Sequence, residues 1–387
     1  MSVLCYNIKN KDTWGEKMSS NNTAVISKAS NHTIKKFELI ENYVKSWAHK
    51  LLQNPHCNGV IFIDCMCNSG VYFNDKDEKV FGTPVRVAKI LRDAAGQYPN
   101  KKIYIYLNDY SAEKIALLRE NLPAEKSNFK YSITIKDGNA LLKEIGSKLD
   151  NRKKLHLFLL YDPYDAHIDW NALSPFFRSW SEVLINHMIS DSIRAVKVAK
   201  SDVAKQKYEE TYLSDFENLL PCGSDKSAYE KRVEEIINGL KGSSSREYYV
   251  ASYPFFNTRN ALQYDLVHCT SNKEGFKLYK TTAWKTFGGK SSIKNTHGKE
   301  NQLMLDMDGS GVLKTEIDEK CYYVKDIADY IQTKFAGMKN VPLSLVWETL
   351  DKHPVFPSDG FRKDIKNDLK NTYGARISRD TISFGGK

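Results

Sequence analysis

The chain has 387 residues, of which 41% are hydrophobic and 27% are charged, and its formal net charge is +10. This composition is typical of a globular protein with one large domain and one small one. It contains no apolar run of about 18 residues and no secretory signal at its start, which argues against a membrane span and for a cytoplasmic location.

The first elements along the chain are a polar arm and an amphipathic helix. Residues 1–32 are rich in Asn, Ser and Lys and are expected to form the arm. Apolar side chains from Phe37 to Leu51 recur at helical spacing, so residues 33–52 are predicted to form a helix with Thr33 as its cap.

Short apolar runs then alternate with helical segments. The predicted strands are 60–63, 103–107, 131–135, 155–160 and 183–185, and the predicted helices are 84–95, 111–121, 139–149 and 169–180. Strands separated by amphipathic helices indicate a parallel sheet that is covered on both faces.

Residues 190–245 interrupt this alternation, because they are dense in charges of both signs and are predicted to form a helical insertion. Two strands follow at 247–253 and 262–269. The segment between them is too short for a crossover helix, so they should pair antiparallel. Five parallel strands followed by an antiparallel pair predict the doubly wound, seven-stranded, Rossmann-like sheet of class I methyltransferases, within a domain of residues 33–285.

The end of the chain differs in composition. Residues 286–320 are rich in Gly, Ser, Asn and Lys and are predicted to form a linker. The block 321–387 contains three helix-sized segments, at 325–335, 342–350 and 358–371, and then a short hairpin. This pattern predicts a small winged-helix-like domain.

Acidic residues follow four successive predicted strands, at Asp64, Asp109, Asp137 and Asp162. In a doubly wound sheet, ligands bind outside the carboxyl ends of the strands, so these side chains should meet at one edge. Each position also has a simpler interpretation as a helix cap or turn residue. Four acids at four strand ends favour a binding site.

These residue types suit S-adenosylmethionine. Asp109 is placed to accept both ribose hydroxyls, because an ionised carboxylate is an acceptor only. Asp64 suits the ammonium group, and the adenine amine suits Asp137 or Asn139. The turn after Asp64 needs backbone that can approach the ligand closely, and its candidate residues are Asn68 and Gly70.

Asp162, Pro163 and Tyr164 form the candidate catalytic turn. A carboxylate can accept protons from a planar amine, an aromatic ring can stack on it, and proline stiffens the turn. Methyl transfer would then be an in-line displacement controlled by positioning.

Cysteines and lysines offer two further candidate sites. Seven cysteines are present, and the spacing of Cys57, Cys65 and Cys67 matches no common zinc site, so no metal is expected. Residues 273–299 carry seven lysines and one glutamate. This segment is either a nucleic-acid-binding stripe or an ordinary solvated helix and loop.

Several stretches together resemble the three-Cys-motif partner proteins (TcmP), a family with a class I methyltransferase-like core. They are TIKKFELIENYVKSWAHKLL, FIDCMCNSGVYF, FGTPVRVAKIL, LLYDPYD, VLIN and YDLVHCTSNKEGFKLYKTTAWK. The resemblance implies S-adenosylmethionine as cofactor and a Cys-motif protein as partner. The chain departs from the family's first turn, because Asn68 stands where the family has glycine and only Gly70 is kept.

The sequence therefore predicts an S-adenosylmethionine-dependent methyltransferase acting on an amine or a nucleic-acid base. One alternative is a methyltransferase-like scaffold that has lost the cofactor and binds protein or nucleic acid. Another is a metal-dependent hydrolase or nuclease using Asp162, Asp165, His167 and Asp169.

Overall fold

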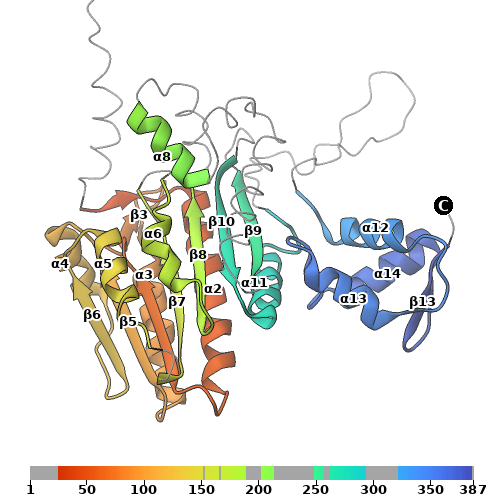
Figure 1. Ribbon diagram of the computed structural model, residues 1–387, viewed down its shortest axis with the longest axis horizontal. Helices are drawn as coiled ribbons and strands as arrows, with labels where there is room; N and C mark the ends of the chain where they lie inside the picture. The colour runs from red at the N-terminus through yellow and green to blue at the C-terminus, as the bar shows by residue number, and fades with distance from the viewer. Residues whose placement is uncertain are drawn as a thin grey trace, which may run out of the picture.

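The computed structural model describes residues 25–150, 153–164, 167–188, 202–212, 248–256, 262–292 and 321–385, and the following statements concern these residues. A large α/β domain built on one seven-stranded sheet is followed by a small module of helices and short strands (Figure 1). Within these ranges no helix is both long enough and apolar enough to cross a membrane.

The central sheet has the strand order of the class I methyltransferase fold, β6-β5-β2-β7-β8-β10-β9. All neighbours pair parallel except β10, which runs antiparallel to both β8 and β9. The strands are β2 (Gly59–Asp64), β5 (Lys102–Asn108), β6 (Phe129–Thr134), β7 (Leu155–Tyr161), β8 (Ser181–His187), β9 (Tyr249–Phe256) and β10 (Leu262–Thr270). The predicted strands and the antiparallel final pair are confirmed.

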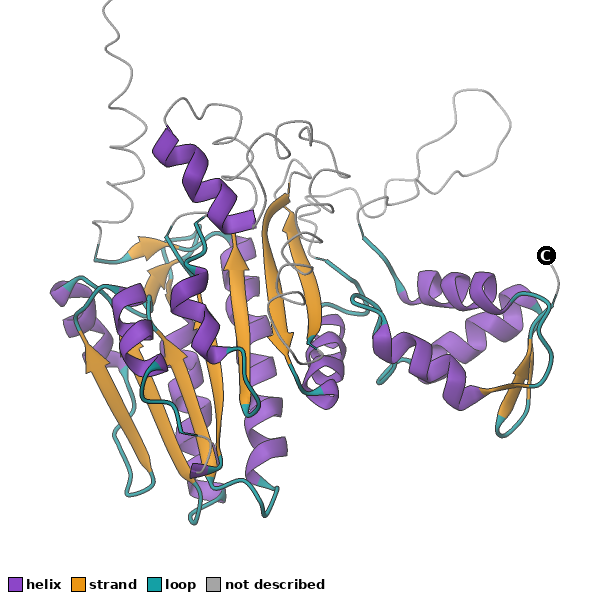
Figure 2. Cartoon of the chain, in the orientation of Figure 1, coloured by secondary structure: helices purple, strands orange, loops and turns teal. Residues whose placement is uncertain are grey.

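One face of this sheet is covered by four helices. They are α2 (Asn31–Leu52), α3 (Thr83–Gln97), α4 (Ala112–Asn121) and α11 (Lys273–Thr286) (Figure 2). Their apolar stripes pack on strand residues such as Phe62, Ile105 and Phe158, none of which is exposed. The predicted helix 33–52 begins earlier than expected, because the Ser30 side chain, and not Thr33, caps it.

The other face carries shorter helices. They are α5 (Gly138–Gly146), α6 (Trp170–Leu173) and the 3-10 turn η2 (Ser174–Phe176), with α8 (Asp202–Tyr212) contributing Tyr212. The predicted helix 169–180 is wrong in its length. Pro175 has no N–H to continue the helix, so the chain turns at Phe177 toward β8. The rest of the predicted insertion 190–245 lies outside the described residues.

A small sheet at the carboxyl edge was not predicted. Strands β3 (Val71–Phe73) and β4 (Lys79–Phe81) form a hairpin between β2 and α3, and β1 (Ser27–Lys28) pairs parallel to β3. The turn of this hairpin, Asn74 to Glu78, has the composition of a tight turn between two apolar runs, which is the sequence signal for it.

The C-terminal module consists of α12 (Val324–Phe335), α13 (Leu343–Lys352) and α14 (Arg362–Tyr373), with β11 (Val341–Pro342), β12 (Arg376–Ile377) and β13 (Thr381–Ser383). The three predicted helices and the terminal hairpin are present, and β11 adds a third strand. Most of the predicted linker, residues 293–320, lies outside the described residues, as do residues 1–24 of the arm.

Candidate functional site

The four predicted acids are gathered at the carboxyl edge of the sheet. Asp64 ends β2, Asp109 follows β5, Asp137 precedes α5 and Asp162 follows β7. Asp64 lies level with Leu107 of β5 and Leu160 of β7, so the three strands end at the same height. Strand order reverses around β2, which is where doubly wound sheets bind ligands.

The turn after β2 contains two residues with left-handed backbone. Asn68 lies at φ 57° and Gly70 at φ 66°, so both occupy the left-handed region. Asn is the non-glycine residue that tolerates this region best, and the Asn68 side chain also accepts a hydrogen bond from the Ser69 N–H at 2.6 Å. A Cβ at position 70 would lie 2.7 Å from Leu118 and 2.8 Å from Val85. Asn68 is therefore accommodated here, whereas Gly70 leaves no room for a side chain.

Asp109 is the centre of this edge. It is 1% exposed, and its carboxylate accepts hydrogen bonds from the Asn68 N–H and the Ser111 N–H, both at 3.0 Å. The Tyr164 hydroxyl donates a further, short hydrogen bond to the same carboxylate. Burial and this acidic acceptor raise the pKa of Tyr164 well above its usual range, so the phenol stays protonated. Asp109 and the turn of residues 162–164 are thus joined directly.

Asp162 also has internal partners. Lys36 of α2 lies 2.7 Å from one of its oxygens, and the Asn186 amide donates to the other at 2.5 Å. The Lys36 side chain is only 10% exposed and that of Asp162 is 28% exposed. Pro163 is buried between Asp162 and Tyr164, which fixes the turn.

Asp64 is 2% exposed, and its carboxylate accepts one hydrogen bond, from the Met66 N–H at 3.2 Å. Burial, followed by the nearby charge of Asp162, raises the pKa of Asp64 to about 8. Asp64 is therefore much less acidic than an exposed carboxyl.

The contacts of Asp137 and Asn139 are made with residues outside this cluster. Asp137 caps α5 by accepting from the Ala140 N–H at 2.8 Å, and Asn139 accepts from the Tyr161 hydroxyl at 3.2 Å. One Asp137 oxygen is used in the cap, and the residue is exposed, so its second oxygen is free to accept from a ligand.

Sequence reasoning missed the residues that hold this edge together. Asn108 is buried and donates to the carbonyls of Cys65 and Lys136, which ties the ends of β2 and β6 to β5. Lys36 and Asn186 were missed because their partner is distant in the chain; Lys36 and Asp162 are 126 residues apart.

A second buried network lies under α2. The Tyr43 hydroxyl donates to Glu182 of β8, and the His268 Nε2 of β10 lies 2.9 Å from the same carboxylate. The His268 ring stacks on Tyr279 of α11, at 4.6 Å between centroids. The histidine that carries part of the family resemblance thus links two strands and two helices within the covered face.

The cysteines Cys57, Cys65, Cys67, Cys269 and Cys321 are free and buried. Burial raises the pKa of Cys65 and Cys67. Within the described ranges, no group of three His, Cys, Asp or Glu side chains is arranged to hold a metal ion. Of the hydrolase candidates, Asp169 caps α6, His167 lies 3.5 Å from Glu210, and Asp165 lies outside the described residues.

The first lysines of segment 273–299 contact the C-terminal module. Lys280 donates to the carbonyls of Leu350 at 3.0 Å and His353 at 2.6 Å. Lys277 lies 3.4 Å from Asp359, and Lys273 lies 3.2 Å from Asp351. Lys294 and Lys299 lie outside the described residues, so a nucleic-acid stripe along this segment stays a prediction.

Comparison with known proteins gives likenesses of fold. No protein-family model matches the chain, and the search of curated proteins found no match. Among solved structures, Trm1 from Pyrococcus horikoshii with S-adenosyl-L-methionine matches at 14% identity and a TM-score of 0.34, over 61% of this chain and 55% of that one. The match thus spans about half of Trm1.

Two other solved structures match at 12% identity. Protein LPL1258 from Legionella pneumophila has a TM-score of 0.37, with 65% of this chain and 92% of that chain covered. The SAH-bound Podospora anserina methyltransferase PaMTH1 has a TM-score of 0.25, with 70% and 98% covered. The fold assignment given above depends on the strand order and directions within this chain.

Proposed function

We propose that this chain binds S-adenosylmethionine at the carboxyl edge and transfers its methyl group to an amine or a nucleic-acid base. The observation that supports this most is Asp109, a buried carboxylate at the end of β5, beside a left-handed turn at the end of β2. Carboxylates that accept forked hydrogen bonds from ribose hydroxyls are suited to this position.

The residues of the edge fit the parts of this cofactor. Asp109 suits the ribose, Asp64 the ammonium group and Asp137 or Asn139 the adenine, while the left-handed turn at Asn68 and Gly70 would lie beside the methionine portion. Bound S-adenosylmethionine supplies an electrophilic methyl group. The fit requires the Tyr164 hydroxyl to leave Asp109, because both ribose hydroxyls need that carboxylate.

The acceptor would meet Asp162, Pro163 and Tyr164. The Asp162 carboxylate and neighbouring backbone carbonyls would accept hydrogen bonds from the amine N–H groups, which turns the amine lone pair toward the reacting carbon. Lys36 and Asn186 hold Asp162 in place, so its orientation is set before the acceptor arrives. Once released from Asp109, the Tyr164 ring can stack on a planar base.

Isothermal titration with S-adenosylhomocysteine tests this proposal. The wild type should bind, Asp109→Ala should lose at least about tenfold in affinity, since hydrogen bonds to a charged group contribute about 1.5–3 kcal/mol, and the exposed Asp93→Ala should bind as the wild type does. Binding that is unchanged by Asp109→Ala would refute the assigned site.

A second function is favoured by one observation. Asp109 and Asp162 are both occupied by side chains of this chain, Tyr164 and Lys36, as expected of a scaffold that no longer needs a cofactor. In this alternative, the chain acts as a binding partner, in line with the resemblance to three-Cys-motif partner proteins and with a winged-helix-like C-terminal module. Absence of any heat with a well-folded wild type would favour it.

A further inference from the structure

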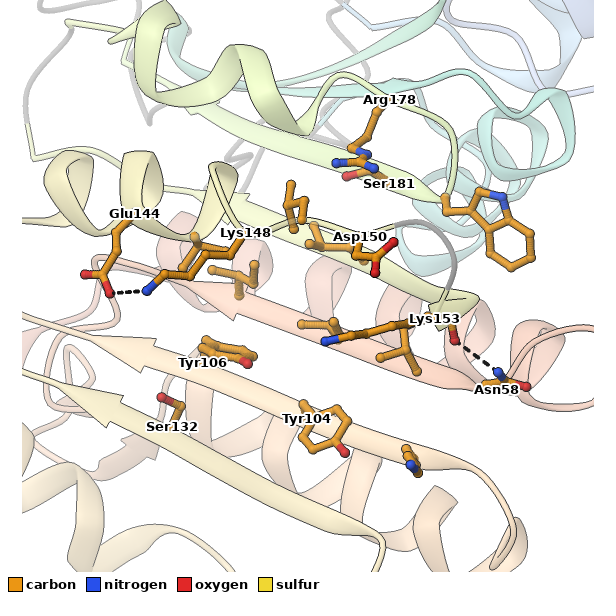
Figure 3. A pocket seen from close by; sticks show the side chains of 18 of the residues that line it. Asn58, Tyr104, Tyr106, Ser132, Glu144, Lys148, Asp150, Lys153, Arg178 and Ser181 are labelled. Carbon is orange, nitrogen blue, oxygen red and sulfur yellow. Dashed lines mark hydrogen bonds and ion pairs between the residues drawn. The ribbon is translucent and has the colours of Figure 1, made fainter.

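A second region with the properties of a binding site lies away from the carboxyl edge. A groove of about 1050 Å³ runs over the face of the sheet that carries α5, across β5, β6 and parts of β2 and β7 (Figure 3). It reaches from Asn58 and Lys153 at the amino end of the strands to Thr134 at the end of β6 and Glu144 of α5. None of its lining residues belongs to the set assigned to the cofactor or the acceptor.

The groove exists because the helices on this face are short. Helix α5 has nine residues and α6 has four, so neither extends along the whole length of β5 and β6. On the opposite face, α2 has 22 residues and α3 has 15. Alternate side chains of β5 therefore point to a packed core on one side and to this groove on the other.

Two tyrosines line the groove from consecutive positions on this face. Figure 3 shows Tyr104 and Tyr106 on β5, with Ser132 of the neighbouring strand beside Tyr106 in the register. Both tyrosines are half-buried, whereas Ile103, Ile105 and Leu107 between and beside them are fully buried. Positions i and i+2 of a strand lie roughly 7 Å apart, a spacing at which two aromatic rings can each take one base of an extended single strand.

The rim of the groove is basic. The lining includes six basic side chains against the acids Glu144 and Asp150; the basic ones are Lys101, Lys102, Lys136, Lys148, Lys153 and Arg178. Glu144 is paired with Lys136 and Lys148 at 2.7 and 2.8 Å. Among the described residues, Lys102, Lys153 and Arg178 make no ion pair, so their charges are available to a polyanion.

Ser181 is a lining residue of the groove whose hydroxyl is buried. Ser181 of β8 is 5% exposed and lines the groove, and its hydroxyl has no hydrogen-bond partner within the described part of the chain.

We propose that this groove binds single-stranded nucleic acid, with bases on Tyr104 and Tyr106 and phosphates on Lys102, Lys153 and Arg178. The positive charge favours a polyanion as the ligand. An apolar protein helix in the groove would leave these three cations without a negative partner. The floor of the groove is a sheet that carries aromatic side chains, and unstacked bases can stack on such side chains. A flat sheet surface presents no helix that could enter a groove of a duplex, so a single strand fits better.

Fluorescence anisotropy with labelled oligouridylate and oligothymidylate of about 12 nucleotides tests this proposal on the full chain. The wild type should bind, and the log–log slope of affinity against salt should be about −2, as expected for three neutralised phosphates on a single strand. Tyr104→Ala/Tyr106→Ala and Lys102→Glu/Lys153→Glu should each weaken binding by about tenfold or more.

Matched controls separate the groove from general charge and from misfolding. Lys45→Glu/Lys76→Glu makes the same charge change at exposed positions outside the groove and should leave affinity within about twofold. Tyr104→Phe/Tyr106→Phe keeps both rings and should retain binding. The proposal is overturned if neither oligonucleotide binds, or if the Lys45 and Lys76 pair matters as much as the groove lysines. Either result leaves S-adenosylhomocysteine binding at the carboxyl edge as a separate question.

Discussion

The two faces of the central sheet differ in how far their side chains are buried and in how their polar groups are paired. On the face under α2, α3 and α11, strand side chains are buried, and α2 supplies polar partners: Lys36 to Asp162 and Tyr43 to Glu182. On the other face, most of the β5 and β6 side chains that line the groove are half-buried, and Lys102 has no ion pair within the described ranges. The first arrangement stabilises the fold and positions the carboxyl edge, whereas the second leaves a surface that a ligand can use.

Neighbouring residues of β5 give the sharpest test of this difference. Ile105→Ala should lower the free energy of unfolding by about 3 kcal/mol, because it opens a cavity in the covered core, whereas Tyr106→Ala should cost only about 1 kcal/mol. Urea unfolding of both variants measures the two costs. Equal losses would show that the second face is as tightly packed as the first.

Replacing Lys36 of α2 tests whether the helices on the covered face stabilise the carboxyl edge. Lys36→Met should destabilise the protein by about 2 kcal/mol, because it leaves Asp162 beside Asp64 without its cation; the exposed part of Asp162 keeps the cost below that of a fully buried pair. The double variant Lys36→Met/Asp162→Asn should recover part of this loss. Thermal unfolding that is unchanged in Lys36→Met would show that the ion pair contributes nothing.

The raised pKa of Asp64 predicts a pH dependence of ligand binding. Its pKa of about 8 means that the carboxyl is mostly protonated below that pH, and a ligand's ammonium group needs it ionised. Affinity for S-adenosylhomocysteine should therefore rise roughly 25-fold from about pH 6.5 to about pH 8.5. Asp64→Asn should flatten this profile; a rise that persists in Asp64→Asn would assign it to another group.

The parts of this account that could be predicted from sequence are local ones. The strands and the acids at their ends are encoded in consecutive residues, so hydrophobic patterning was sufficient to predict them. The length of helix 169–180 was misjudged because Pro175 was outweighed by the apolar pattern around it.

Contacts between distant segments could not be predicted in the same way. Nothing near Lys36 indicates that it reaches Asp162, and nothing near Tyr164 indicates that its hydroxyl reaches Asp109 across 55 residues. The groove likewise results from the shortness of α5 and α6, and the tyrosines of β5 alone do not distinguish an open face from a packed one.

Titration of the wild type and Tyr164→Phe with S-adenosylhomocysteine is the most direct test of the central claim that the carboxyl edge is a cofactor site closed by Tyr164. Both proteins should bind, and Tyr164→Phe should bind up to about tenfold more tightly, because the ligand no longer displaces a hydroxyl from Asp109. The absence of heat with both proteins, each shown to be folded, would contradict the claim.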